Sequence, residues 1–178
     1  MTDLKDRKPA FAGSRSFLKN GYFLIIVCAF LIYIYYLGTR LVLAIVPEGN
    51  KDVITIPSYI GDRWHISFTH SVEKTAWDEF FTVNGPNDMT MTHTRFQSLG
   101  WGYPYSASDG VFSRTDDGRF QLIMNRSYKE IPLRISEQAM QNIIHGQQSY
   151  DLVALYGQGT ALTIKSMYRY QYWLKYYF

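Results

Sequence analysis

The chain has 178 residues, enough for one hydrophobic core, and its 47% hydrophobic and 17% aromatic content excludes a disordered protein. The formal net charge of +3 comes from the residues before Pro47, because the remainder carries 12 basic and 13 acidic residues. It therefore lacks the positive surface of a nucleic-acid-binding protein, and the single cysteine, Cys28, excludes an intrachain disulfide and a thiolate zinc site.

The first part of the chain predicts a membrane anchor. Residues 1–20 form a basic segment, and residues 21–46 are apolar enough to predict a transmembrane helix. A helix from Tyr22 to Val46 rises roughly 37 Å and can cross a bilayer core of about 30 Å. No A-x-A pattern follows it, which disfavours a cleaved signal peptide.

The distribution of lysine and arginine predicts the orientation of this anchor. These residues are more frequent before the helix than after it, so the positive-inside bias places the N-terminus in the cytoplasm. We therefore expect a single-pass protein of the inner (cytoplasmic) membrane. Residues 47–178 would form an extracytoplasmic β domain, which is periplasmic in a Gram-negative bacterium and otherwise extracellular.

After Pro47 the sequence changes to an alternation of apolar and polar residues, which is typical of half-buried strands. Strands are expected at 64–72, 77–83, 89–99, 119–124, 128–135, 149–155 and 160–172. One short helix is predicted between Ser136, as its N-cap, and Gly146, as its stop signal. The fold class is therefore all-β, an antiparallel sandwich or small barrel with one short helix, preceded by the transmembrane helix.

The stretch FTHSVEKTAWDEFF, residues 68–81, carries two ionisable residues on faces that are otherwise apolar. A short loop in its middle would form a hairpin that pairs Phe68 with Phe81. The same register sets His70 directly opposite Glu79. In this register the residues on either side of His70 and Glu79 also pair apolar with apolar, so the apolar side chains of both strands lie on one face.

The next turn extends the same face to a third strand. Asn-Gly-Pro-Asn-Asp at 84–88 is a strong turn signal, and a five-residue loop there would pair Phe81 with Met91. Glu79 would then lie opposite His93. The sequence thus predicts one carboxylate between two imidazoles on an inward face.

Three interpretations of this cluster remain open. The first is a buried pair of His70 and Glu79 that only stabilises the fold, because a carboxylate in an apolar layer needs a partner. The second is a divalent-metal site made by His70, Glu79 and His93, a set of ligands known for zinc. The third is a polar cluster of His70, Ser71, Glu73 and Glu79 that lines a ligand pocket.

Two aromatic segments are candidate contact surfaces. The first is a rigid glycine- and proline-containing loop with large rings, formed by Gly100, Trp101, Gly102, Tyr103 and Pro104. The second is the aromatic and basic C-terminal tail, which contains Tyr172, Trp173, Tyr176, Tyr177 and Phe178. Such residues favour a membrane interface or a membrane subunit, whereas the alternative for both segments is packing against the domain itself.

The order and spacing of four stretches indicate a family: FTHSVEKTAWDEFF, TRFQSLGWGYP, MNRSYKEIPLRIS and GQQSYDLVALYGQGTALTIK. Over residues 64–166 the chain resembles the uncharacterised family of domains of unknown function numbered eighteen-fifty, found beside TRAP transporters of the TAXI type. The resemblance is carried by a His-Ser-Val-Glu stretch, a second glutamate and a Gly-x-Gly-x-Pro loop: His70, Ser71, Val72, Glu73, Glu79, Gly100, Gly102 and Pro104. His93, Trp101 and the aromatic tail depart from that pattern, which weakens the three-residue metal site.

The resemblance implies a companion of a TRAP-TAXI system, which takes up organic anions with an ion gradient. We therefore expect a non-enzymatic accessory subunit that assembles or gates the transporter, or docks its binding protein, with the transporter's membrane subunit or binding protein and the lipid bilayer as partners. No catalytic residue follows from the resemblance. The alternative is an extracytoplasmic ligand- or metal-binding module or hydrolase centred on His70 and Glu79, with a divalent metal as its only candidate cofactor.

Overall fold

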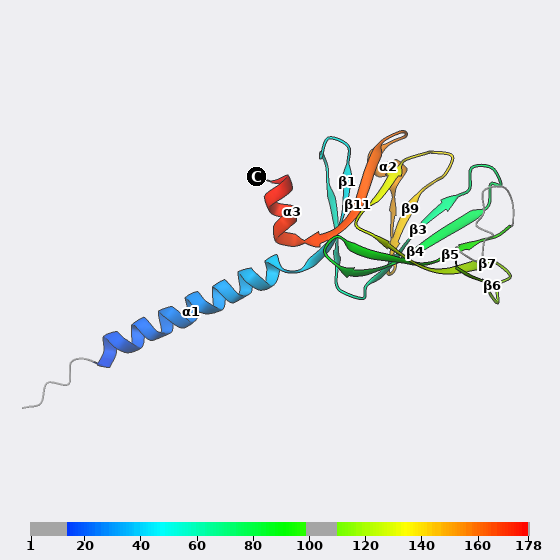
Figure 1. Ribbon diagram of the computed structural model, residues 1–178. Coiled ribbons are helices and arrows are strands. Elements are labelled where there is room, and N and C mark those ends of the chain that lie inside the picture. Colours follow the sequence, from blue (N-terminus) through cyan, green and yellow to red (C-terminus); the bar gives the residue numbers. More distant parts are fainter. Residues whose placement is uncertain (1–13, 99–109, 178) are drawn as a thin grey trace, which may run out of the picture. The chain divides into compact units, whose positions relative to one another are not determined.

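The computed structural model describes residues 14–98 and 110–177, with side chains from residue 21 onward (Figure 1). The chain divides after Gly38 into two compact units. The first unit holds the helix α1 (Ser14–Gly38), and the second holds the strands of the described chain.

Helix α1 is a candidate membrane span by length and composition. Its segment Gly21–Gly38 has a mean hydropathy of 2.1. Side chains around it are exposed, and Ile25 and Ile32 keep 64% and 67% of their accessible surface. A helix that is apolar on all sides needs an apolar environment, which a bilayer supplies.

The predicted helix over residues 21–46 is wrong in its second half. Helix α1 ends at Gly38, and Leu41–Pro47 form strand β1, in which all residues are buried. Alternate β1 residues, such as Ile45 and Ala44, belong to two different apolar clusters. A strand buried on both faces reads as an unbroken apolar run, so periodicity alone did not separate it from a helix.

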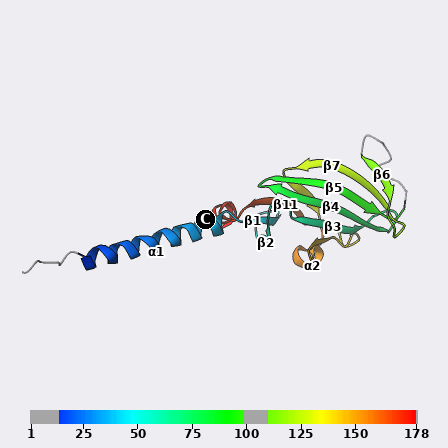
Figure 2. The ribbon, with the colours of Figure 1, turned by 90° about the horizontal axis from the view of Figure 1, so that it is seen from below.

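The second unit is built from two antiparallel sheets (Figures 1 and 2). The small sheet has the order β2-β1-β11-β8, with bounds β1 Leu41–Pro47, β2 Ile54–Ser58, β8 Ile131–Arg134 and β11 Ala161–Tyr168. The large sheet has the order β10-β9-β3-β4-β5-β7-β6, with bounds β3 Arg63–Thr69, β4 Ala76–Gly85, β5 Asp88–Phe96, β6 Val111–Arg114, β7 Phe120–Tyr128, β9 Asn142–His145 and β10 Gln148–Asp151. The two further helices are α2 (Leu152–Tyr156) and α3 (Arg169–Tyr176). The predicted all-β architecture is confirmed.

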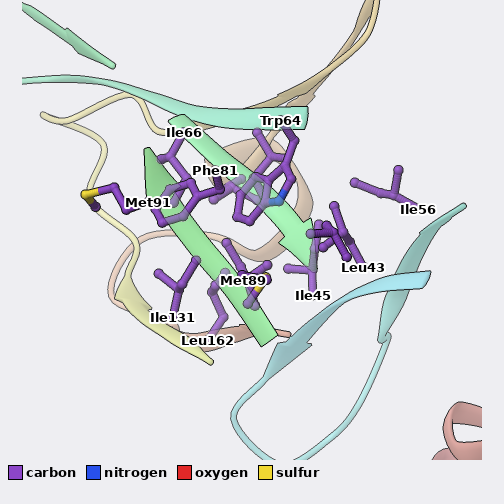
Figure 3. Packing of buried hydrophobic residues seen from close by; sticks show 14 of the residues in the cluster. Leu43, Ile45, Ile56, Trp64, Ile66, Phe81, Met89, Met91, Ile131 and Leu162 are labelled. Carbon is purple, nitrogen blue, oxygen red and sulfur yellow. The ribbon is translucent and has the colours of Figure 1, made fainter. Parts of the chain in front are cut away.

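The main hydrophobic core lies between the two sheets. Figure 3 shows residues such as Leu43 and Ile56 of the small sheet facing the large sheet. Trp64 of β3 and Phe81 of β4 stack there with ring centroids 4.7 Å apart, and both are almost fully buried. This core occupies the inner face of the large sheet, so the outer-facing residues of β3, β4 and β5 are those that alternate with it.

The helix predicted between Ser136 and Gly146 is wrong. Residues 142–145 form β9, which pairs with β3 and places Ile143 opposite Ile66. Gly146, with φ near +59°, begins the tight turn to β10 instead of ending a helix. The apolar residues of this segment fit both periods, and pairing with a distant strand overrides the local preference.

The C-terminal strand is shorter than predicted. Strand β11 ends at Tyr168, and residues Arg169–Tyr176 form α3 instead of extending the strand to residue 172. The Gln171 side chain accepts a hydrogen bond from the Tyr168 backbone N–H at 3.0 Å, which caps the start of the helix. Tyr172 is buried against the apolar cluster on the other face of β1.

Candidate functional site

The hairpin of β3 and β4 forms, but in a different register from the predicted one. Ile66, not His70, lies opposite Glu79, and Phe68 lies opposite Trp77. Residues 70–75 form the loop, closed by the Lys74 backbone N–H donating to the His70 carbonyl at 2.9 Å. The shift is by an even number of residues, so every side chain keeps its predicted face and the apolar pattern fits both registers.

The predicted pair of His70 and Glu79 is therefore wrong. The His70 ring lies in the loop and stacks on Trp77 with centroids 5.6 Å apart, and its Nδ1 accepts the backbone N–H of Glu73 at 3.3 Å. Glu79 stays on the inner face between Ile66 and Thr94. No described residue forms a hydrogen bond or ion pair with its carboxylate, and burial raises its pKa.

The third strand of the predicted cluster is displaced by a β-bulge. Phe81 pairs with Met91 as predicted, but Thr92 is an extra residue, so His93 lies opposite Phe80 and Glu79 lies opposite Thr94. His93 consequently faces outward. No group of three His, Cys, Asp or Glu residues within the described ranges 14–98 and 110–177 could hold a metal ion, so the predicted set of His70, Glu79 and His93 is not assembled.

The other predicted residues fall in three places. Ser71 is exposed in the loop, and the Glu73 carboxylate accepts a hydrogen bond from Ser98 Oγ at 3.5 Å. The predicted contact loop, Gly100 to Pro104, and Phe178 lie outside the described residues. In the tail, Tyr172 is buried, whereas Trp173 and Tyr177 keep 38% and 71% of their surface.

Glu79→Gln is expected to stabilise the β domain at pH 7 by about 1 kcal/mol, because glutamine removes a desolvated charge without changing the shape. Burial raises the pKa of Glu79 in the folded state, so its proton stabilises the fold at acid pH, and that contribution is lost as the pH rises through the raised pKa. Urea unfolding at several pH values measures this, and the advantage of the variant should shrink toward about pH 4. Asp116→Asn, at an exposed carboxylate, is the control. The same change in the free energy of unfolding with pH in both variants would contradict the expectation.

A buried histidine–carboxylate pair does exist, at positions that the sequence pattern did not indicate. Asp62 Oδ2 lies 2.8 Å from His145 Nε2 and accepts a hydrogen bond from Ser58 Oγ at 2.8 Å. Asp62 is 5% exposed. It joins the end of β2 in the small sheet to the end of β9 in the large sheet, and this position indicates a structural role.

The outer face of the large sheet carries a groove of about 590 Å³. Its floor is a row of three rings, in which His65 of β3, Phe80 of β4 and His93 of β5 lie directly opposite one another. The ring centroids are 4.7 Å apart between His65 and Phe80 and 4.1 Å apart between Phe80 and His93, and both pairs are stacked. The alternation of side chains along β4 turns Phe80 away from the core that contains Phe81.

Two arginines flank this row. Arg95 lies over the Phe80 ring, with its guanidinium carbon 5.1 Å from the centroid, and its Nε donates to Gln121 Oε1 at 2.8 Å. Arg63 is exposed and forms no hydrogen bond or ion pair with a described residue. Strands β3 and β5 both pair antiparallel with β4 and therefore run in the same direction. Arg63 lies two residues before His65 on β3, and Arg95 lies two residues after His93 on β5. The two arginines therefore belong to opposite ends of the groove.

The imidazoles of the row are held in the neutral state. Burial lowers the pKa of His65, although Asp78 partly opposes this effect. Burial also lowers the pKa of His93, and the positive charges of Arg95, His65 and Arg63 lower it further. Each neutral ring offers one N–H donor, and His93 Nδ1 lies 3.0 Å from Thr92 Oγ1.

Residues 65–152 match a family whose description is "Domain of unknown function (DUF1850)". The match begins at His65 within β3 and includes β4 and β5, so it covers the three rings and Arg95 but not Arg63. No curated protein matches the chain, and no solved structure matches it. The resemblance to the DUF1850 family is therefore confirmed over residues 65–152.

Proposed function

We propose that the chain is a membrane-anchored accessory subunit of a TRAP-TAXI organic-anion transporter, acting through an extracytoplasmic β domain. The observation that carries this proposal is α1, whose segment Gly21–Gly38 is apolar and only 6% buried. Such a helix needs lipid to cover it, and within the bilayer its side chains can also pack against the helices of another membrane protein. The match to DUF1850 supports the choice of partner only through the place beside TAXI-type transporters that the resemblance implies.

The basic N-terminal segment supports an orientation with the N-terminus inside. Five lysines and arginines precede residue 20, whereas Arg40 and Lys51 are the first two after α1. By the positive-inside bias, the β domain is then outside the cytoplasmic membrane. Only Thr39 and Arg40 separate α1 from β1, so the connector between the helix and the β domain is short.

Helix α3 offers a docking surface at the end of this domain. One face packs on the small sheet through Tyr172. The helix also exposes Tyr170, Trp173 and Leu174, at 40%, 38% and 65%, and Tyr177, directly after the helix, keeps 71% of its surface. Tryptophan and tyrosine are the residues that most often anchor protein interfaces, and Lys175 adds a positive charge suited to the membrane surface.

The full chain, purified from its native membranes in mild detergent, is expected to co-purify with the large membrane subunit of the transporter. Replacing Trp173 and Tyr177 together by alanine should lower the recovered partner at least about tenfold, because exposed aromatic anchors dominate such contacts. Tyr59→Ala with Ile60→Ala is the matched control, since both residues are also large, apolar and exposed, at 63% and 69%, but lie far from α3 in sequence. A monodisperse chain without a partner would contradict the proposal, and equal loss in the control would contradict the role of α3.

A further inference from the structure

The groove on the outer face of the large sheet has a composition that selects an anion. Its lining contains two arginines and two histidines and no aspartate or glutamate: Arg63, Trp64, His65, Phe80, Phe81, Thr82, Thr92, His93, Arg95, Ile144 and Gly146. Asp78, on the same face, is already bound by Arg119, whose Nη1 lies 2.8 Å from its Oδ2. The lining of the groove therefore carries an arginine at each end and no carboxylate.

Arg95 is held ready to bind a carboxylate. Its Nε donates to Gln121 Oε1 and its guanidinium carbon lies 5.1 Å from the Phe80 centroid, while its two terminal nitrogens make no hydrogen bond within the described part of the chain. A guanidinium group positioned in this way loses little side-chain freedom on binding. Two parallel N–H donors match the two oxygens of a carboxylate, and the resulting bonds are charge-assisted.

The floor of the groove accounts for the rest of the ligand. His65, Phe80 and His93 form a continuous row of stacked rings that is partly open to solvent. Because the rings stack on one another, the row presents ring edges to the groove, and a flat apolar group that lies across them gains buried area and edge-to-face contacts. Ile144 of β9 closes one end of the row with an aliphatic side chain, and Thr82 and Thr92 add hydroxyl groups at its edge.

We propose that this groove binds a small organic carboxylate with a planar body, whose carboxylate pairs with Arg95 or Arg63 and whose body lies over the His65–Phe80–His93 row. The groove contains no residue of the His70 loop or of α3, so a test of this proposal does not depend on the proposed accessory role. An inorganic anion would use the arginines but gain nothing from the rings. A neutral aromatic compound would use the rings but leave the arginines without a partner.

The test is a titration of the full chain in detergent, followed by NMR of the histidine side chains. The probes are benzoate, benzyl alcohol, acetate and inorganic phosphate, each raised to about 10 mM. Benzoate is expected to give saturable shifts of the His65 and His93 signals and to leave those of His70 and His145 in place. Benzyl alcohol, acetate and phosphate should bind at least about tenfold more weakly.

Variants assign the binding to the groove. Arg63→Gln with Arg95→Gln should weaken benzoate binding at least about tenfold, and Phe80→Leu should weaken benzoate but not acetate. Arg114→Gln is the matched control, because Arg114 also lies over a phenylalanine of the same sheet, 5.3 Å from the Phe120 centroid, but outside the groove. Absence of saturable shifts up to about 10 mM, an unchanged affinity in the double variant, or phosphate binding as tight as benzoate would each overturn the proposal.

Discussion

Replacing Asp62 with alanine is expected to lower the free energy of unfolding of the β domain by about 2–3 kcal/mol, because it removes the acceptor of two hydrogen bonds in a largely buried place. The carboxylate is 5% exposed and holds both Ser58 Oγ and His145 Nε2 at 2.8 Å. Alanine leaves both groups without this acceptor in a largely buried place. It also removes a contact that joins the small sheet to the large one.

Urea unfolding of the full chain in detergent measures this change. All four tryptophans lie after Gly38, so their near-ultraviolet circular dichroism reports the β domain and not α1. Asp116→Ala, at an exposed position, is the control and should change the stability by less than about 0.5 kcal/mol. If Asp62→Ala unfolded at the same urea concentration as this control, the histidine–carboxylate pair would have no structural role.

The elements that the sequence predicted well are those with one clear period and one buried face. β3, β4 and β5 alternate between core and outer residues, so their positions followed from the pattern within a few residues. The apolar part of helix α1 was also predicted, because an apolar run of about 18 residues or more is typical of a membrane span. Strand β1 was missed because both of its faces are buried, which removes the alternation that identifies a strand.

The candidate site was harder to predict because it depends on register. The correct pairing of β3 with β4 differs from the predicted one by an even number of residues, and both bury Phe81 and Ile66 on the same face. The bulge at Thr92 then turns His93 outward, and a single extra residue of this kind leaves no clear mark in the sequence. The predicted cluster placed His93 inside the sheet for this reason.

The row of His65, Phe80 and His93 had a signal in the sequence, but only in part. His65 occupies an outer position of a clearly alternating strand, and a histidine there reads as an ordinary surface residue. Only the observed register brings it beside Phe80 and brings Phe80 beside His93. Three residues far apart in the sequence thus become one surface, and no local pattern could indicate that without the strand pairings.

Phe81→Ala is expected to lower the free energy of unfolding by about 3–5 kcal/mol, the range for truncating a buried phenylalanine. Phe81 is 1% exposed, stacks on Trp64 at 4.7 Å and meets the Tyr128 ring edge-on at 6.1 Å. Truncation leaves a cavity between the sheets, and loss of the ring pair adds to the cost. The near-ultraviolet signal of Trp64 should also decrease in the folded variant.

Phe112→Ala separates this effect from a general loss of aromatic surface. Phe112 lies on the edge strand β6 and keeps 46% of its surface, so its truncation should cost about 1 kcal/mol or less. If the two variants have equal unfolding slopes, the difference between their urea midpoints gives the difference in their free energies of unfolding. Equal midpoints would mean that the two sheets do not depend on the Trp64–Phe81 stack. A large difference would place that stack at the centre of the core, and the outer-face rings would then rest on a strand whose other side is firmly fixed.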